Sequence, residues 1–96
     1  MLESEFQSHL IKKLKRIFNG CIVIKNDPNY IQGLPDLLVL YQDKWVALEV
    51  KRNAHASVRP NQQYYVEQMN AMSYSTFIFP ENEEVIFNEI QQIFSS

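Results

Sequence analysis

The chain has 96 residues, which is enough for one domain with one modest core and too few for two. Its composition, 46% hydrophobic and 21% charged, is typical of a globular protein, and the single cysteine excludes an internal disulfide and a cysteine-based zinc site. No apolar run is long enough to cross a bilayer, so we expect a cytoplasmic protein without a membrane partner. The net charge of −2 argues against nucleic-acid binding through overall charge and leaves only local basic patches for that role.

The first predicted element is an amphipathic helix over residues 3–18. Its apolar residues recur at three- and four-residue spacing, and they are Phe6, Leu10, Leu14 and Ile17. Asn19 and Gly20 end this helix. A β-branched run over residues 21–24 then predicts a short strand, and the turn-forming residues that follow predict an irregular loop up to residue 35.

Two further apolar runs, residues 37–41 and 45–50, flank a polar turn over residues 42–44 and predict an antiparallel hairpin. Both runs are apolar on both faces, which indicates that helices cover the sheet on each side. Pro60 opens a second helix, residues 73–79 form another strand, and a last helix follows. The order α-β-β-β-α-β-α predicts a single α/β domain over residues 1–96, with a mixed sheet flanked by helices.

Three charged residues interrupt the apolar hairpin. Asp36 precedes its first strand and Glu49 lies near the end of its second, so the hairpin brings the two carboxylates together, and Lys51 shares the face of Glu49. Converging carboxylates repel each other unless a cation joins them, and Mg²⁺ prefers oxygen ligands, to which the backbone carbonyl of Val50 would add one. Lys51 would then position or activate the water that hydrolyses a phosphodiester. The alternative is structural, with Asp36 capping a turn and the other two residues forming a solvated pair at a sheet edge.

Four motifs surround this cluster. They are G-x-P-D-L at residues 33–37, E-V-K at residues 49–51, E-S-x-F-Q at residues 3–7 and P-N-Q at residues 60–62. The first two resemble the signature of the PD-(D/E)xK nuclease superfamily. Together, in order and over nearly the whole chain, the four motifs resemble the small stand-alone VRR-NUC nucleases of phages and bacteria, which are similar to Holliday-junction resolvases.

This resemblance implies a restriction-endonuclease-like α-β-β-β-α-β core with an added C-terminal helix, and the cytoplasm of a bacterial or phage-infected cell. It also implies dependence on Mg²⁺ or Mn²⁺ and a metal-binding glutamate in the first helix, for which Glu3 and Glu5 compete. Glu3 is favoured because it lies in line with the apolar stripe, whereas Glu5 shares its face with His9 and Lys12. The predicted metal ligands are Glu3, Asp36, Glu49 and the backbone carbonyl of Val50.

The family further implies a glutamine in the second helix, which is either Gln62 or Gln63. Gln62 is favoured because apolar residues follow it at three, four and seven positions, which places it on the inward face; the alternative role is that of a satisfied core polar group. The predicted catalytic residues are Asp36, Glu49, Lys51 and Gln62. The candidate DNA contacts are Lys25, Tyr30, Arg52 and Arg59.

No segment resembles a base-reading module, so we expect recognition of DNA shape rather than sequence. The chain is therefore predicted to be a Mg²⁺- or Mn²⁺-dependent endonuclease that hydrolyses phosphodiester bonds in branched, junction-like DNA, as a homodimer and without a small-molecule substrate. The alternative is a non-catalytic DNA-binding or interaction subunit that retains the nuclease fold. Metal binding separates the two, because a binding-only subunit has no physical need to hold two acids together.

Overall fold

The structure, a computed structural model, describes all of residues 1–96. Its helices are α1 (Glu3–Ile17), α2 (Pro60–Met72) and α3 (Glu83–Ser95), and a 3₁₀ turn, η1 (Pro80–Asn82), leads into α3. Its strands are β1 (Ile22–Lys25), β2 (Leu37–Tyr41), β3 (Lys44–Val50) and β4 (Tyr74–Ile78). The predicted α/β class and order of elements are confirmed. None of the helices combines the length and the apolar character needed to cross a bilayer.

The four strands form one mixed sheet in the order β1-β2-β3-β4. The first three strands are antiparallel to their neighbours, and β4 returns parallel to β3 after the crossover through α2. The hairpin turn has only two residues, Gln42 and Asp43, because Lys44 already pairs with Tyr41. Gln42 adopts a φ of 57°, as a tight hairpin turn requires. The predicted turn over residues 42–44 is therefore one residue too long.

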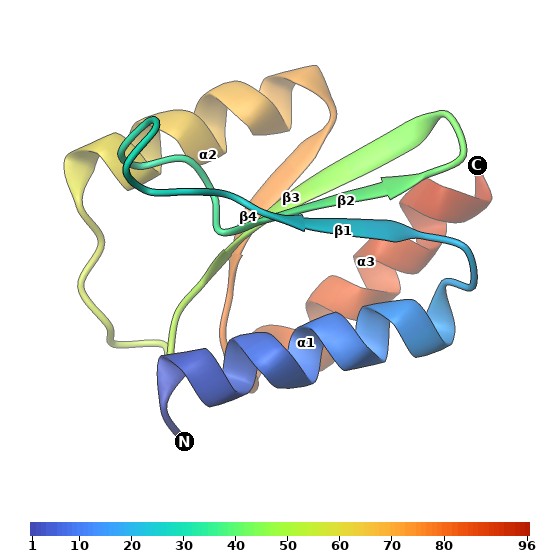
Figure 1. The fold of residues 1–96 in the computed structure, drawn as a ribbon, viewed down its shortest axis with the longest axis horizontal. Coiled ribbons are helices and arrows are strands. Elements are labelled where there is room, and N and C mark those ends of the chain that lie inside the picture. The colour runs from blue at the N-terminus through green and yellow to red at the C-terminus, as the bar shows by residue number, and fades with distance from the viewer.

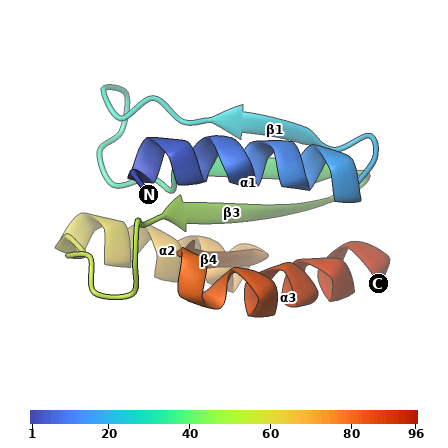
Figure 2. The same ribbon diagram turned by 90° about the horizontal axis from the view of Figure 1, so that it is seen from below.

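Helices cover both faces of the sheet, as the apolar strands predicted (Figure 1). In Figure 2, α1 and α3 lie in front of the sheet and α2 lies behind it. The core lies between the sheet and the first of these layers. The residues of α1 and α3 buried there, together with Phe18 at the C-cap of α1, are Phe6, Leu10, Leu14, Phe18, Ile86, Phe87, Ile90 and Phe94.

The apolar stripe of α1 ends on Phe18 rather than on Ile17. Phe18 is 4% exposed and packs edge-on against Phe94, with ring centroids 5.0 Å apart, whereas Ile17 is 42% exposed. The position four residues after Leu14 continues the buried face, while the position three residues after it lies at the rim. The chain then turns through Gly20, whose φ of 91° favours glycine, and enters β1.

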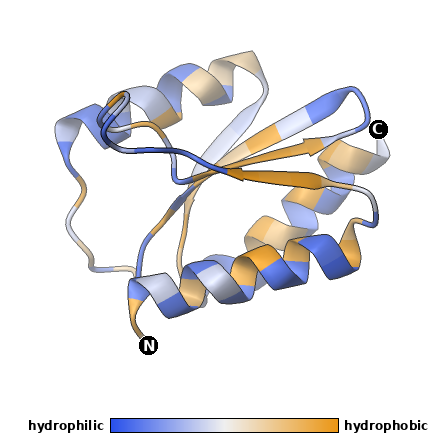
Figure 3. Ribbon diagram, in the orientation of Figure 1, coloured by the Kyte–Doolittle hydropathy of each residue, from blue (hydrophilic) through white to orange (hydrophobic).

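The α2 face of the sheet is only partly covered, because α2 packs on β3 and β4 and leaves β1 and β2 open. Ile22 and Ile24 of the edge strand β1 are 59% and 40% exposed on this side. A shallow apolar hollow of about 230 Å³ lies beside them, lined by Leu38, Leu40, Trp45, Met69 and Met72. Figure 3 shows that β1 and β2 are hydrophobic along their length. The open half of this face is thus apolar surface without a covering element.

Candidate functional site

Asp36 and Glu49 lie opposite each other at one end of the sheet. The hairpin register pairs Leu37 with Leu48, so the residues just beyond that pair occupy facing positions on the two chains. The Oδ2 atom of Asp36 accepts a hydrogen bond from the backbone N–H of Val50 at 2.8 Å, which fixes this carboxyl against the end of β3. The structure therefore brings the two acids together.

Burial and mutual repulsion favour a protonated form of this pair. Glu49 is only 3% exposed, and burial, followed by the charge of Asp36, raises the pKa of Glu49 to about 8 against the opposing charge of Lys51. Burial also raises the pKa of Asp36, although the N–H of Val50 and a hydrogen bond from Glu49 counteract this rise. With the pKa of Glu49 raised to about 8, the pair would hold one proton between its two carboxyls near neutral pH.

Gln62 links Lys51 to Glu49. Its Oε1 accepts a hydrogen bond from Nζ of Lys51 at 2.8 Å, and its Nε2 donates to Oε2 of Glu49 at 3.0 Å. The same Oε1 accepts the backbone N–H of Arg59 at 3.0 Å, so Gln62 also caps the first turn of α2. Nζ of Lys51 lies 3.8 Å from Oε2 of Glu49, and both side chains are buried. A helix terminus thus fixes the position of the amine relative to the acids.

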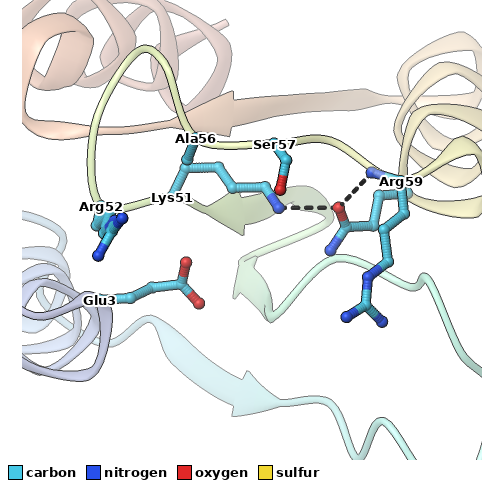
Figure 4. A pocket seen from close by; sticks show the side chains of 7 residues that line it. Glu3, Lys51, Arg52, Ala56, Ser57 and Arg59 are labelled. Atoms are coloured by element: carbon cyan, nitrogen blue, oxygen red, sulfur yellow. Dashed lines mark hydrogen bonds between the residues drawn. The ribbon is translucent and has the colours of Figure 1, made fainter.

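The contacts in the structure distinguish Gln62 from Gln63 in α2 and Glu3 from Glu5 in α1. Gln63 is exposed and donates to a glutamate of its own helix, so only Gln62 reaches the acids. Glu5 accepts the backbone N–H at the start of α1, whereas Glu3 lines a cavity together with Lys51 (Figure 4). The structure therefore brings Gln62 rather than Gln63 to Glu49, and it places Glu3 rather than Glu5 at the cavity of Lys51.

The facing carboxyls of Glu49, which is buried, and Asp36, which is half-buried, are a donor set that fits a hard divalent cation, because the cation would replace a proton and relieve the repulsion. The N–H and C=O of a strand residue point to the same side, and the N–H of Val50 faces Asp36, so the Val50 carbonyl is directed there as well. These three residues would hold Mg²⁺ or Mn²⁺.

Glu3 does not complete this ligand set in the structure. No group of three or more Asp, Glu, His or Cys residues lies close enough together to hold a metal ion. Glu3 is exposed on the first turn of α1 and lines a different cavity from the one that contains Asp36 and Glu49. Its charge nevertheless contributes to the raised pKa of Glu49. The predicted ligand set that includes Glu3 is thus not assembled, because Glu3 lines the cavity of Lys51 and Arg52 and not the one that contains Asp36 and Glu49.

Two polar cavities adjoin the cluster. The larger has a volume of about 440 Å³, and its lining residues are Glu3, Lys51, Arg52, Ala56, Ser57, Arg59 and Gln62. The smaller has a volume of about 200 Å³ and contains Asp36 and Glu49, between the β1–β2 loop and the first turn of α2. Their linings are almost entirely polar, which suits an extended polar ligand better than an apolar small molecule.

The four candidate DNA contacts differ in their distance from the acids. Arg52 and Arg59 line the larger cavity, and Arg59 lines the smaller one too. Lys25 is exposed at the end of β1, and its charge counteracts the raised pKa of Asp36. Tyr30 is 82% exposed on the β1–β2 loop but lines neither cavity. Only the two arginines are therefore part of the site itself.

The loop that carries Asp36 is held by contacts that no sequence pattern indicated. Asn26 donates its backbone N–H to the carbonyl of Asp36 at 2.9 Å, and its side-chain amide donates to the carbonyl of Pro35. Gly33 has a φ of 94°, and a Cβ atom there would lie 2.9 Å from the backbone carbon of Asn61. The loop is thus fastened to β1 on one side and pressed against α2 on the other. The turn-forming residue types predicted a loop, but nothing in them named these partners.

The chain was compared with protein-family models, with curated proteins and with solved structures, and none of the three comparisons finds a match. The functional conclusion rests on the residues and on their geometry.

Proposed function

We propose that the chain is a metal-dependent nuclease of the PD-(D/E)xK superfamily, similar to the small VRR-NUC nucleases, which hydrolyses phosphodiester bonds in branched DNA. The observation that carries this proposal is geometric: the half-buried Asp36 faces the buried Glu49 at the end of the hairpin, and Lys51 is fixed 3.8 Å from Glu49. The structural alternative, a solvated pair at a sheet edge, does not fit. Glu49 and Lys51 are 3% and 8% exposed, and β3 is an interior strand of the sheet.

The arrangement of the elements supports a restriction-endonuclease-like core. A helix, an antiparallel meander of three strands, a crossover helix and a parallel fourth strand follow in the order that the resemblance implies. The acids and the amine stand where β2 begins and β3 ends, so a rigid apolar hairpin sets their separation. The C-terminal helix α3 completes the core on the face opposite the site.

Each polar group of the site has a defined part in this proposal. A bound Mg²⁺ or Mn²⁺ would supply Lewis-acid polarisation of the phosphate and a more acidic water. Asp36 and Glu49 would hold the ion, and Glu49 would release its proton to the solvent in exchange for the ion. Lys51 donates to the attacking water or to a phosphate oxygen. Gln62 orients the amine through the bond that it accepts and steadies Glu49 through the bond that it donates.

The test is cleavage, in Mn²⁺, of four-way-junction, flap, single-stranded and linear duplex DNA of matched sequence. We expect Asp36→Ala and Lys51→Ala each to slow cleavage by about 100-fold or more, because each removes several kcal/mol of transition-state stabilisation. Glu84→Ala changes an exposed carboxylate on α3 and should cleave as the wild type does. Circular dichroism establishes that each variant folds.

Two outcomes would contradict the proposal. Full activity of either site variant would remove Asp36 or Lys51 from the reaction. A wild-type protein that neither cleaves any of the four substrates nor binds Mn²⁺ in calorimetry would instead be the non-catalytic subunit.

The proposal includes a homodimer as the active form. The chain has a net charge of −2 and only local groups of basic residues. Two-fold symmetry would place two copies of these basic groups on one branched substrate. The apolar surface over β1 and β2 offers a face for the second copy. In light scattering at micromolar concentration, Ile22→Glu should be monomeric, whereas Val85→Glu, which changes an exposed residue of α3, should remain dimeric. A wild-type protein that is monomeric with and without DNA would contradict the dimer.

A further inference from the structure

The larger cavity concentrates positive charge on an acidic chain. Lys51, Arg52 and Arg59 line it against a single carboxylate, that of Glu3, although the chain as a whole carries a net charge of −2. In Figure 4, Arg52 and Arg59 stand on opposite sides of Lys51, and Ser57 lies between Lys51 and Arg59. The cavity is thus a cationic hollow with a hydroxyl group in its wall.

The two arginines of this hollow have no partner within the protein. Neither guanidinium takes part in any of the ion pairs, and the one hydrogen bond of Arg59 to a side chain uses its backbone N–H. Arg52 and Arg59 thus present two planar, permanently charged guanidinium groups that line one cavity and form no ion pair with a carboxylate, and such groups suit an anion with several oxygens, above all a phosphate.

Gln62 separates this hollow from the acids. Its Oε1 faces Lys51 in the larger cavity, and its Nε2 faces Glu49 in the smaller one. Arg59 lines both cavities, so they form neighbouring compartments on either side of one side chain. A DNA strand that places one backbone phosphate beside Asp36 and Glu49 would place the next phosphate of the strand towards the cationic hollow.

We propose that the larger cavity is a second phosphate subsite, which binds the phosphate adjacent to the scissile one on the strand that is cut. This inference rests on the proposed nuclease function for the place of the scissile phosphate, but the subsite binds its phosphate without metal and without hydrolysis. Arg52 and Arg59 grip the phosphate oxygens, and Ser57 donates its hydroxyl hydrogen. The carboxylate of Glu3 repels the phosphate, so the wild-type protein binds the phosphate more weakly than Lys51, Arg52 and Arg59 would without Glu3.

The first test measures binding in EDTA, so that no cleavage takes place. The probe is a fluorescein-labelled single strand of twelve thymidines, titrated by anisotropy over a range of salt concentrations. We expect Arg52→Ala and Arg59→Ala each to weaken binding and to reduce the slope of log affinity against log salt by about 0.7, the value for one lost contact to a single strand. Arg16→Ala is the matched control, because it removes an exposed arginine from the other end of α1 and should leave the slope unchanged.

Glu3→Gln gives a change of the opposite sign. It should tighten binding of the same strand in EDTA, because it removes the only carboxylate of the cavity. A variant that merely disturbed the fold would weaken binding instead. Unchanged slopes in both arginine variants, or the absence of measurable binding by the wild type at low salt, would overturn the subsite.

The second test locates the phosphate. Single methylphosphonate substitutions remove the charge of one phosphate at a time along the strand. We expect one position to cost the wild type about tenfold in affinity, as the loss of a charged hydrogen bond does, and to cost Arg52→Ala little. An equal cost in both proteins would overturn the assignment. The outcome is independent of the nuclease proposal, since a protein that fails to cleave in Mn²⁺ can still show this coupling in EDTA.

Discussion

Replacing Glu49 with Gln tests the electrostatics of the site separately from catalysis. The variant keeps the shape of the side chain and an acceptor for Nε2 of Gln62, but it cannot ionise, so no second negative charge forms opposite Asp36 at any pH. Burial and the charge of Asp36 raise the pKa of Glu49 from 4.5 to about 8 in the folded protein. Between these pH values the folded protein keeps a proton that the unfolded chain has released. The free energy of unfolding of the wild type therefore falls as the pH rises from 4.5 towards 8, and Glu49→Gln should lack this part of the decline.

The raised pKa sets the size of the effect. One pKa unit corresponds to about 1.4 kcal/mol, so the rise from 4.5 to about 8 has a ceiling of about 5 kcal/mol. Water in the adjoining cavity screens the interaction, and we therefore expect about 2 kcal/mol. In a chain of this length, that difference corresponds to about 10 °C in Tm.

The assay is urea or thermal unfolding followed by circular dichroism at pH 5, 7 and 9 in EDTA. The stability of Glu49→Gln relative to the wild type should increase with pH, and Glu84→Gln, which changes an exposed carboxylate, should follow the wild type. Mg²⁺ added at pH 8 should stabilise the wild type and not Glu49→Gln, because the ligand set is incomplete in the variant. Parallel curves of the wild type and Glu49→Gln from pH 5 to pH 9 would refute the raised pKa and, with it, the argument for a cation site.

Three further predictions follow from the same structure. Gly33→Ala should destabilise the protein by about 1 to 3 kcal/mol more than Gly20→Ala in urea denaturation, since both residues have positive φ but only the first would clash with α2; equal losses would contradict the close approach. Glu83→Gln should cost about 1 kcal/mol at pH 7 and less near pH 3. Burial raises the pKa of Glu83, but hydrogen bonds from two basic side chains of α1 outweigh burial and lower the pKa below 4.5. The contribution of Glu83 to the free energy of unfolding therefore disappears as the pH falls through this pKa. A loss of stability in Glu83→Gln that does not depend on pH would contradict this prediction. Binding of Mg²⁺ at pH 7 should release close to one proton from Glu49, measured by calorimetry in buffers of different ionisation enthalpy, and the absence of release would contradict the shared proton.

Local patterns in the sequence were sufficient for the elements and for the centre of the site. The alternation of side chains along a strand and the short turn at Gln42 place Asp36 opposite Glu49, because both depend on neighbours within one hairpin. Helical phase selected Gln62 over Gln63 for the same reason, since it depends only on residues within two turns.

Tertiary packing alone decided which residues of the helices, strands and loops contact one another at the site. The side chain of Gln62 bonds to Glu49 in β3, to Lys51 just after β3 and to its own helix terminus, and Asn26, which directly follows β1, fastens the loop before Asp36. It also decided that Glu3 faces a cavity with Arg52 rather than joining the acids. The bonds of Gln62 to Glu49 and Lys51 join different elements, and their geometry depends on how α2 packs on the sheet. A periodic pattern specifies which face of an element is buried, but it does not specify which residue of another element that face meets.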